Sequence, residues 1–427
     1  MAPGADRVGS VAHAMPTQTL LVTVSGHDKP GVTKALFTAL DAYPVTVLDV
    51  EQLVVRGHLI LTALVGFPED PNEPDLPAQI RTAVRQSAAT MDMDVTTVLG
   101  AEEDGDRRRN RIHITVLGHP LRPAAVAALA QELSARGGNI DRIRRVASYP
   151  VTAIVFECSG AEVSDLRRAL AEAAATHRVD VAVQEAGLDR RGRYLVVMDV
   201  DSTVIQDEVI DVIAELAGVG PEVARITERA MAGEMDFGTS LTARVELLRG
   251  LPAARLSEVR ERVTLTPGAR TLCRTLNNLG YPICLVSGGF IEVVGPLAEE
   301  LGVSGVRANA LEVKDGLLTG RLSGPIIDRA GKRAALEEFA AEFGIPMRRT
   351  IAIGDGANDI DMLQAAGLGV AFNAKASAKD AADAAVSVPY LDSVLYLLGV
   401  TREDIEGADA REGLLTPSPP IRPGRAG

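Results

Sequence analysis

The stretch VVMDVDSTVIQDEVI, residues 196–210, places several carboxylates directly after an apolar run. Acidic side chains are rarely buried unless they pair with a cation or bind a metal ion. Asp199 and Asp201 lead this group, and Asp355 opens the later motif DGAND. Mg²⁺ prefers oxygen ligands and commonly takes one or two carboxylates together with water and substrate phosphate. We therefore expect a Mg²⁺ site with carboxylates from Asp199 and Asp355 and the backbone carbonyl of Asp201.

The same carboxylates could carry out phosphoryl transfer. Asp199 ends the apolar run and is the best-placed nucleophile to attack phosphorus and form an aspartyl-phosphate. Asp201 could protonate the leaving alkoxide and then activate the water that hydrolyses the intermediate. Ser287 and the N–H of Gly288, in the motif SGG, could hold phosphoryl oxygens, and Lys332 could offset their charge. Phosphoryl transfer depends mainly on such positioning and electrostatics.

Two further residues indicate what could carry the phosphate. Glu208 could pair with an ammonium group, and Arg244 could bind a carboxylate through its planar fork. The pair favours a phosphorylated amino acid as substrate. A related phosphatase or phosphotransferase for another small amino-acid-like phosphate is an alternative, and a catalytically inactive amino-acid sensor is a second one. The intact set of Asp199, Asp201 and Lys332 argues against the sensor.

Unbroken apolar runs precede these motifs and indicate the sheet that positions them. YLVVMDV, YPICLVSGG and TIAIGDG are separated by helical segments. Continuous apolar strands that alternate with helices indicate a doubly wound parallel sheet, covered on both faces. Chemistry in such sheets lies at the carboxyl ends of the strands, where Asp199, Ser287 and Asp355 fall. We predict an α/β domain over residues 192–405, with a helical cap over about 206–263.

Two diverged copies of one pattern precede this domain. Each copy reads strand, helix, two strands, helix and strand, which predicts a ferredoxin-like βαββαβ domain. The first copy covers residues 17–100, the second covers 111–188, and the charged segment 101–110 links them. The chain is therefore predicted to contain two small α/β domains followed by one larger one.

The motifs of the larger domain resemble the haloacid dehalogenase superfamily, with its Rossmannoid fold, and over about residues 194–398 they resemble most closely its phosphoserine phosphatases. The segments DSTVIQDEVID, MAGEMDFGTSLTARVELLRG and VSGGF carry the closer resemblance. It implies Mg²⁺-dependent hydrolysis of phosphoserine to serine and phosphate, the last step of serine biosynthesis, through an aspartyl-phosphate. The residues implied are Asp199 as nucleophile, Asp201 as general acid and base, Asp199, Asp201 and Asp355 as metal ligands, and Glu208, Arg244, Ser287, Gly288, Lys332 and Asn358 as substrate-binding residues.

The two small domains resemble ACT domains, which often bind amino acids and pair with one another. The resemblance implies a homodimer through this half of the chain and an amino-acid effector, with serine as the first candidate. The loop GHDKPG matches the family's ligand loop, and it opens a helix whose N–H groups could attract a carboxylate. The second copy reads GHPLRP and has prolines in place of Asp28 and Gly31. The candidate effector residues are Gly26, Asp28, Gly31 and Gly118.

Composition limits the remaining possibilities. The chain of 427 residues carries a net charge of −13, which argues against nucleic acid or an anionic membrane as a partner. No apolar run approaches the roughly 20 residues of a membrane span, and residues 1–16 lack the apolar core of a signal peptide. The three cysteines have no metal-binding spacing. We expect a cytoplasmic protein with disordered ends at 1–16 and 406–427.

Overall fold

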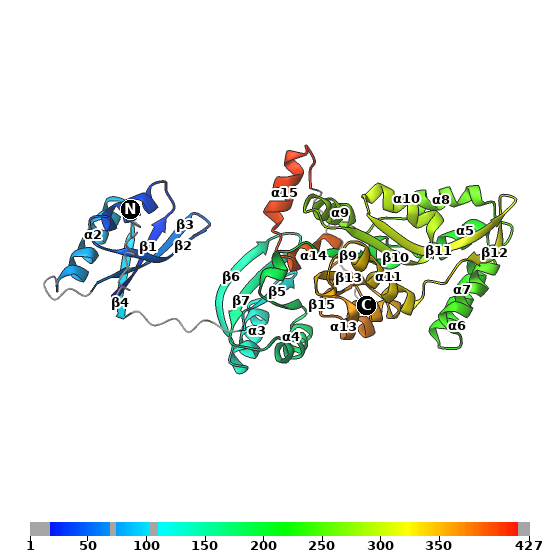
Figure 1. Cartoon of the computed structure of the whole chain (residues 1–427), viewed down its shortest axis with the longest axis horizontal. Coiled ribbons are helices and arrows are strands. Elements are labelled where there is room, and N and C mark those ends of the chain that lie inside the picture. The colour runs from blue at the N-terminus through cyan, green and yellow to red at the C-terminus, as the bar shows by residue number, and fades with distance from the viewer. Residues whose placement is uncertain (1–17, 69–73, 102–109, 417–427) are drawn as a thin grey trace, which may run out of the picture. The chain divides into compact units, whose positions relative to one another are not determined.

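The computed structural model describes residues 18–68, 74–101 and 110–416, and it divides into two compact units, Met1–Arg107 and Arg108–Gly427 (Figure 1). The predicted disordered lead at 1–16 lies outside the described residues. So do most of the predicted linker and the last part of the predicted disordered tail.

The first unit is a four-stranded antiparallel sheet packed against two helices. Its elements are β1 (Gln18–His27), α1 (Val32–Leu40), β2 (Thr46–Val55), β3 (His58–Phe67), α2 (Leu76–Thr90) and β4 (Asp94–Ala101), and the strand order is β2-β3-β1-β4. Alternate side chains of β1, such as Leu20 and Val22, are buried in one core with Val32 and Leu36 of α1. The βαββαβ pattern predicted for this unit is confirmed.

The second unit begins with another βαββαβ domain. Its elements are β5 (Ile112–Gly118), α3 (Pro123–Ala135), β6 (Asn139–Ala147), β7 (Thr152–Ser159), α4 (Val163–His177) and β8 (Asp180–Glu185). Strand β8 pairs antiparallel with β15 (Ala384–Val386) of the α/β domain, with Ala182 opposite Ala384. The two domains therefore share one sheet of 11 strands, in the order β12-β11-β10-β9-β13-β14-β15-β8-β5-β7-β6. The sequence patterns did not predict this junction.

The α/β domain is built around β9 (Leu195–Met198), which lies between β10 (Ile283–Phe290) and β13 (Thr350–Gly354) and is parallel to both. The sheet continues through β14 (Leu368–Phe372) on one side, and through β11 (Gly305–Lys314) and the antiparallel edge strand β12 (Leu317–Ser323) on the other. All four residues of β9 are buried because both faces of the sheet are covered. Helices α11 (Arg329–Glu342) and α12 (Ile360–Ala365) cover one face, and α9 (Ala269–Asn278) and α10 (Ile291–Leu301) cover the other.

A set of helices follows β9 directly and forms the predicted cap. These are α5 (Val209–Ala217), α6 (Gly220–Met231), α7 (Phe237–Glu246) and α8 (Leu256–Arg262), and Figure 1 shows α6 and α7 packed side by side. Asp236 caps α7 by accepting a hydrogen bond from the N–H of Thr239 at 2.9 Å. Helix α7 therefore begins at a fixed point, about two turns before Arg244.

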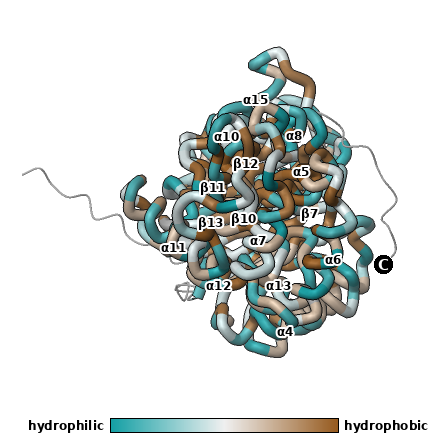
Figure 2. Tube along the Cα trace, turned by 90° about the vertical axis from the view of Figure 1, so that its right-hand side faces the viewer, coloured by the Kyte–Doolittle hydropathy of each residue, from teal (hydrophilic) through white to brown (hydrophobic). Residues whose placement is uncertain are grey.

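Hydrophobic residues concentrate along the strands, and hydrophilic residues are more frequent on outer helices such as α6 (Figure 2). Among residues 18–68, 74–101 and 110–416, the helices are all too short or too polar to cross a membrane.

The end of the chain is more ordered than we predicted. Helix α15 (Arg402–Arg411) extends past residue 405, where the α/β domain was predicted to end, and the chain is described as far as Thr416. Asp409 is buried and accepts hydrogen bonds from Arg274 of α9, Nε to Oδ1 at 2.7 Å and Nη2 to Oδ2 at 2.6 Å. The first part of the predicted disordered tail is therefore a helix anchored by an ion pair. The proline and glycine residues near the end of the chain favour disorder, but the contact with Arg274, which forms only in the folded chain, orders α15.

We predict that Asp409→Ala lowers the free energy of unfolding of the second unit by about 3 kcal/mol, because Arg274 would keep a mostly buried charge without its partner. Chemical denaturation measures the change. Glu412→Ala is the comparison, since Glu412 lies at the same end of α15 but is exposed and accepts a hydrogen bond from the uncharged Asn278 at 2.8 Å, so its effect should be much smaller. An equal effect of the two substitutions would contradict the anchoring role of Asp409.

Candidate active site

A buried ion triplet lies at the carboxyl edge of the parallel strands. Nζ of Lys332 is 2.7 Å from Oδ1 of Asp199 and 2.7 Å from Oδ1 of Asp359. The three side chains are at most 3% exposed. Burial alone would lower the pKa of Lys332, but Asp199 and Asp359 outweigh it and raise that pKa above its ordinary value. Lys332 therefore stays positively charged at the centre of the site.

Local structure brings the three members of this triplet together. The N–H of Asp199 donates to the carbonyl of Ile353 at 2.9 Å, which holds the end of β9 beside the end of β13. Asp359 lies in the turn after β13 and accepts a hydrogen bond from the N–H of Gly356 at 2.9 Å. Asp328 caps α11 through the N–H of Gly331 at 2.8 Å and so fixes the helical turn that carries Lys332.

Asp199, Asp355 and Asp359 form a group that could hold a metal ion, with one carboxylate oxygen of each within 4.8 Å of the others. Burial, followed by the charge of Asp359, raises the pKa of Asp199 well above its ordinary value and that of Asp355 to about 6. One ammonium does not balance three carboxylates, so the donor set fits a hard divalent cation. We had not predicted a role for Asp359, although it is the last residue of the motif GDGAND.

Asp201 lies beside this group in a different environment. Its Oδ1 accepts a hydrogen bond from the N–H of Val209 at 2.8 Å, and its Oδ2 accepts one from Oγ of Ser287 at 3.2 Å. Burial, followed by the charge of Glu208, raises the pKa of Asp201 to about 7. A carboxyl group with this pKa can both give and take a proton near neutral pH, as a general acid and base must.

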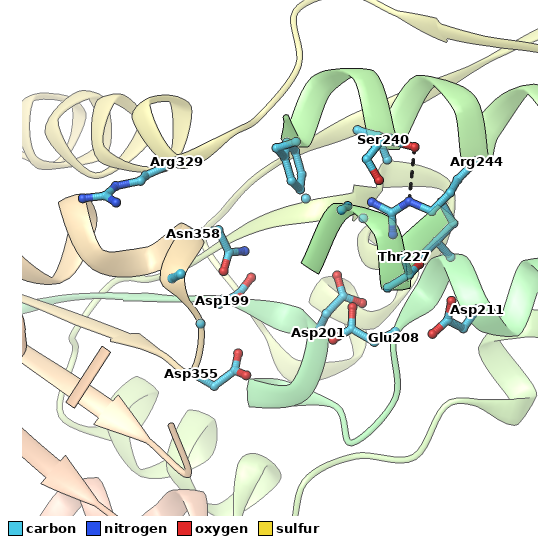
Figure 3. Close-up of a pocket in the computed structure, with 18 of the residues that line it drawn as sticks. Asp199, Asp201, Glu208, Asp211, Thr227, Ser240, Arg244, Arg329, Asp355 and Asn358 are labelled. Carbon is cyan, nitrogen blue, oxygen red and sulfur yellow. Dashed lines mark hydrogen bonds between the residues drawn. The ribbon is translucent and has the colours of Figure 1, made fainter. Parts of the chain in front are cut away.

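A cavity of about 550 Å³ opens in front of these carboxylates and extends under the cap. Figure 3 shows Arg244 reaching from α7 toward Glu208 and Asp201, with Asp199 and Asp355 farther along the cavity. Glu208 accepts a hydrogen bond from Oγ of Ser202 at 2.9 Å, and Nε of Arg244 donates to the carbonyl of Ser240 at 3.3 Å. One end of the cavity thus carries a cation and a carboxylate, and the other end carries the buried acids.

Seven of the predicted residues line this cavity, and two lie behind its wall. The two are Ser287 and Lys332, which are 0% and 1% exposed. Oγ of Ser287 already accepts the N–H of Gly289 at 2.8 Å and donates to Asp201, so in this state it positions the acid. The seven residues are Asp199, Asp201, Glu208, Arg244, Gly288, Asp355 and Asn358.

The candidate effector residues fall in two separate units. Gly31 precedes α1 with φ of 99°, and the N–H of Asp28 donates to the carbonyl of Gly57 at 2.8 Å. A Cβ atom on Gly26 would lie 2.7 Å from Sδ of Met93, and one on Gly118 would lie 3.0 Å from Cα of Leu121. Local backbone geometry or packing therefore accounts for each of these glycines without a ligand. Asp28 is exposed and is the polar side chain among the four candidate residues.

The fold, the three strand-end motifs and Lys332 of α11 define the class of protein, a haloacid dehalogenase-like hydrolase, and that family matches residues 196–364. ACT domain families match residues 18–98 and 112–184. The phosphoserine phosphatase of Streptomyces coelicolor is 53% identical over 400 residues, which cover 94% of this chain and 97% of that protein. The chain belongs to the phosphoserine phosphatase family.

Two further relatives agree with this assignment. The phosphoserine phosphatase of Mycobacterium tuberculosis is 48% identical over 398 residues, which cover 92% of this chain and 96% of that protein. The unliganded crystal structure of a probable phosphoserine phosphatase from Vibrio cholerae has 35% identity and a TM-score of 0.54, and the match covers 67% of this chain and 86% of that one. The resemblance predicted from the motifs is confirmed.

The ion triplet predicts how stability responds to the loss of its cation. In metal-free protein, Lys332→Met should lower the free energy of unfolding at about pH 8 by roughly 3–5 kcal/mol, because two buried carboxylates lose their partner. Without Lys332, which lowers the pKa of Asp199, that pKa should rise further. A carboxyl whose folded pKa exceeds its unfolded value costs stability at high pH and regains it as pH falls through the folded pKa.

The deficit of Lys332→Met should therefore shrink as the pH is lowered from about 8, as denaturation in the presence of a chelator would measure. Arg333→Met removes an exposed cation from the next residue of α11, where it pairs with Glu337 at 2.9 Å, and should show neither the deficit nor its pH dependence. A deficit that stays constant with pH would contradict a role for Lys332 in neutralising the acids.

Proposed function

We propose that the chain hydrolyses O-phospho-L-serine to L-serine and phosphate as the last step of serine biosynthesis. One observation carries the proposal: Glu208 and Arg244 face the same cavity as Asp199 and Asp201. Phosphoserine has an ammonium to pair with Glu208 and a carboxylate to pair with Arg244. Its phosphate would then lie beside Asp199 and Asp201. The names of the relatives in Streptomyces and Mycobacterium support the same substrate.

The proposed reaction runs in two steps. Asp199 attacks phosphorus to form an aspartyl-phosphate, and Asp201 protonates the oxygen of serine as it leaves. Asp201 then removes a proton from the water that hydrolyses the intermediate, a reversal of role that its pKa of about 7 suits. Lys332 stays charged and stabilises the negative charge beside Asp199, and the N–H of Gly288 and the side chain of Asn358 contact phosphoryl oxygens.

The proposal includes Mg²⁺ as cofactor. Asp199 and Asp355 would hold it with their carboxylates and Asp201 with its backbone carbonyl, and Asp359 lies close enough to Asp199 and Asp355 to take part directly or through water. When bound, the ion offsets the charge of the acids so that a phosphate dianion can approach them. The supporting observation is the excess of carboxylates over cations at the site.

Arg244 gives the sharpest test of the substrate. In purified protein with Mg²⁺, Arg244→Ala should raise KM for phosphoserine by about 30-fold or more, since truncating one partner of a desolvated charge pair costs about 2–5 kcal/mol. The KM for an aryl phosphate, which has no carboxylate, should change little. Phosphate release measures both, and a chelator should abolish both activities.

The control for this test is Arg329→Ala, because Arg329 also lines the cavity but pairs with Asp361. It should leave the preference for phosphoserine unchanged. Equal losses on both substrates with Arg244→Ala would contradict recognition of a carboxylate. No release from phosphoserine by the native protein, with release from another phosphorylated small molecule, would favour the alternative substrate class.

We also propose that the ACT half binds an amino-acid effector, with serine as the first candidate, and that it forms a homodimer. Support comes from the two ACT family matches and from the exposed Asp28, which could take an ammonium group. A cytoplasmic location is part of this proposal, and the three free, buried cysteines are consistent with it.

Regulation by serine predicts that Asp28→Ala keeps phosphoserine hydrolysis but loses the noncompetitive part of serine inhibition. Initial rates over a grid of serine and phosphoserine concentrations separate this part from competition in the active site. Asp41→Ala, at an exposed residue after α1, is the control and should behave like the native protein. Strictly competitive inhibition in the native protein would contradict an effector site in this half.

A further inference from the structure

A second cavity lies in the second unit, where the βαββαβ domain meets the α/β domain. Its volume is about 470 Å³, within the size range of small-ligand sites. Ile112 and Ile114 of β5 pack against α3 and α4, so His113 between them projects from the opposite face of the sheet toward the cavity. Leu398 and Gly399, which follow α14 (Val394–Leu397), form part of the other wall.

The charged side chains of this cavity are mostly cationic. Arg111, Arg144 and Arg190 line it together with one carboxylate, Glu157, whose Oε1 is 3.5 Å from Nε of Arg144. Burial, followed by the charge of Arg190, lowers the pKa of His113 to about 4, so the ring is neutral near pH 7. Among the described side chains, the lining therefore carries two positive charges in excess.

Two of the guanidinium groups converge on one point. A Cβ atom at Gly399, where φ is 80°, would lie 3.4 Å from Nη2 of Arg190 and 3.5 Å from Nη2 of Arg144. Both guanidinium groups therefore lie beside the same backbone position, and like charges close together repel more strongly in a partly buried site than in water. A glycine at this position leaves both groups open to a shared anion.

Arg190 is held in place from both domains. Its Nη1 donates to Oε1 of Gln184 on β8 at 2.8 Å, and its Nη2 donates to the carbonyl of Leu397 at 3.2 Å. Near it, Nδ1 of His113 is buried and makes no hydrogen bond within the described part of the chain. The cavity thus offers fixed cationic donors and one unused polar atom.

We propose that this cavity is a binding site for a phosphate-type dianion, either free phosphate or the phosphate group of a small metabolite. A dianion would neutralise the two excess charges, whereas a carboxylate would neutralise one. Guanidinium groups match phosphate oxygens through paired hydrogen bonds. Because the walls come from two domains, a bound dianion would also stabilise their junction.

Titration calorimetry of the full-length protein with inorganic phosphate tests the proposal. Arg144→Gln should weaken one phosphate-binding step at least fivefold and reduce the phosphate-induced rise in melting temperature, while phosphoserine hydrolysis is retained. Arg111→Gln, at an exposed residue of the same lining, is a second variant that guards against a folding defect and should weaken the same step.

The control is Arg321→Gln, which removes an equal charge from an exposed residue of β12, at the opposite edge of the sheet from β6. It should bind phosphate like the native protein. None of the three substitutions changes a residue of the catalytic cavity. Binding of methylphosphonate as well as phosphate would extend the site to substituted phosphates, and binding of phosphate alone would restrict it to the free ion. Equal phosphate binding by Arg144→Gln, Arg111→Gln and Arg321→Gln, or equal affinity for acetate and phosphate at matched ionic strength, would overturn the proposal.

Discussion

One buried ammonium shared by two buried carboxylates is the constraint on which the catalytic site depends. Lys332, Asp199 and Asp359 have almost no contact with solvent, and buried charges are tolerated only with close partners. The triplet requires the end of β9, the turn after β13 and the first turn of α11 to meet at one point. The central position of β9 in the sheet, with β13 as its neighbour, makes that meeting possible.

This arrangement places the buried acids at one end of the cavity and Arg244 at the other. The end of β9 and the turn after β13 provide the acids, and the first turn of α11 provides the lysine. Backbone hydrogen bonds such as that from Asp199 to Ile353 fix the strand ends. Arg244 comes from the cap, a separate set of helices inserted after β9, the first strand of the α/β domain. Under the proposed function, a change in α7 could alter recognition of the substrate without disturbing the ion triplet, because no member of the triplet comes from the cap.

Much of the fold could be predicted because its signals are local. Unbroken apolar strands ending in Asp199, Ser287 and Asp355 indicate a parallel sheet and place the chemistry at its edge. The pairing of β8 with β15 could not be predicted, since a single bridge between domains leaves no periodic pattern. The role of Asp359 was also missed, because only the fold shows that this acid faces Lys332. The order of α15 could not be predicted either, because it depends on a contact with Arg274, which is distant in the sequence.

The central claim is that Asp199 becomes phosphorylated during turnover. The direct measurement is to quench the native protein with phosphoserine in the steady state, reduce the acyl phosphate with borohydride, and map the modified residue by mass spectrometry. The account predicts homoserine at position 199 and nowhere else in the peptide that also contains Asp201 and Asp207. Rapid turnover of phosphoserine with no reduced residue, or reduction at Asp201 instead, would contradict it.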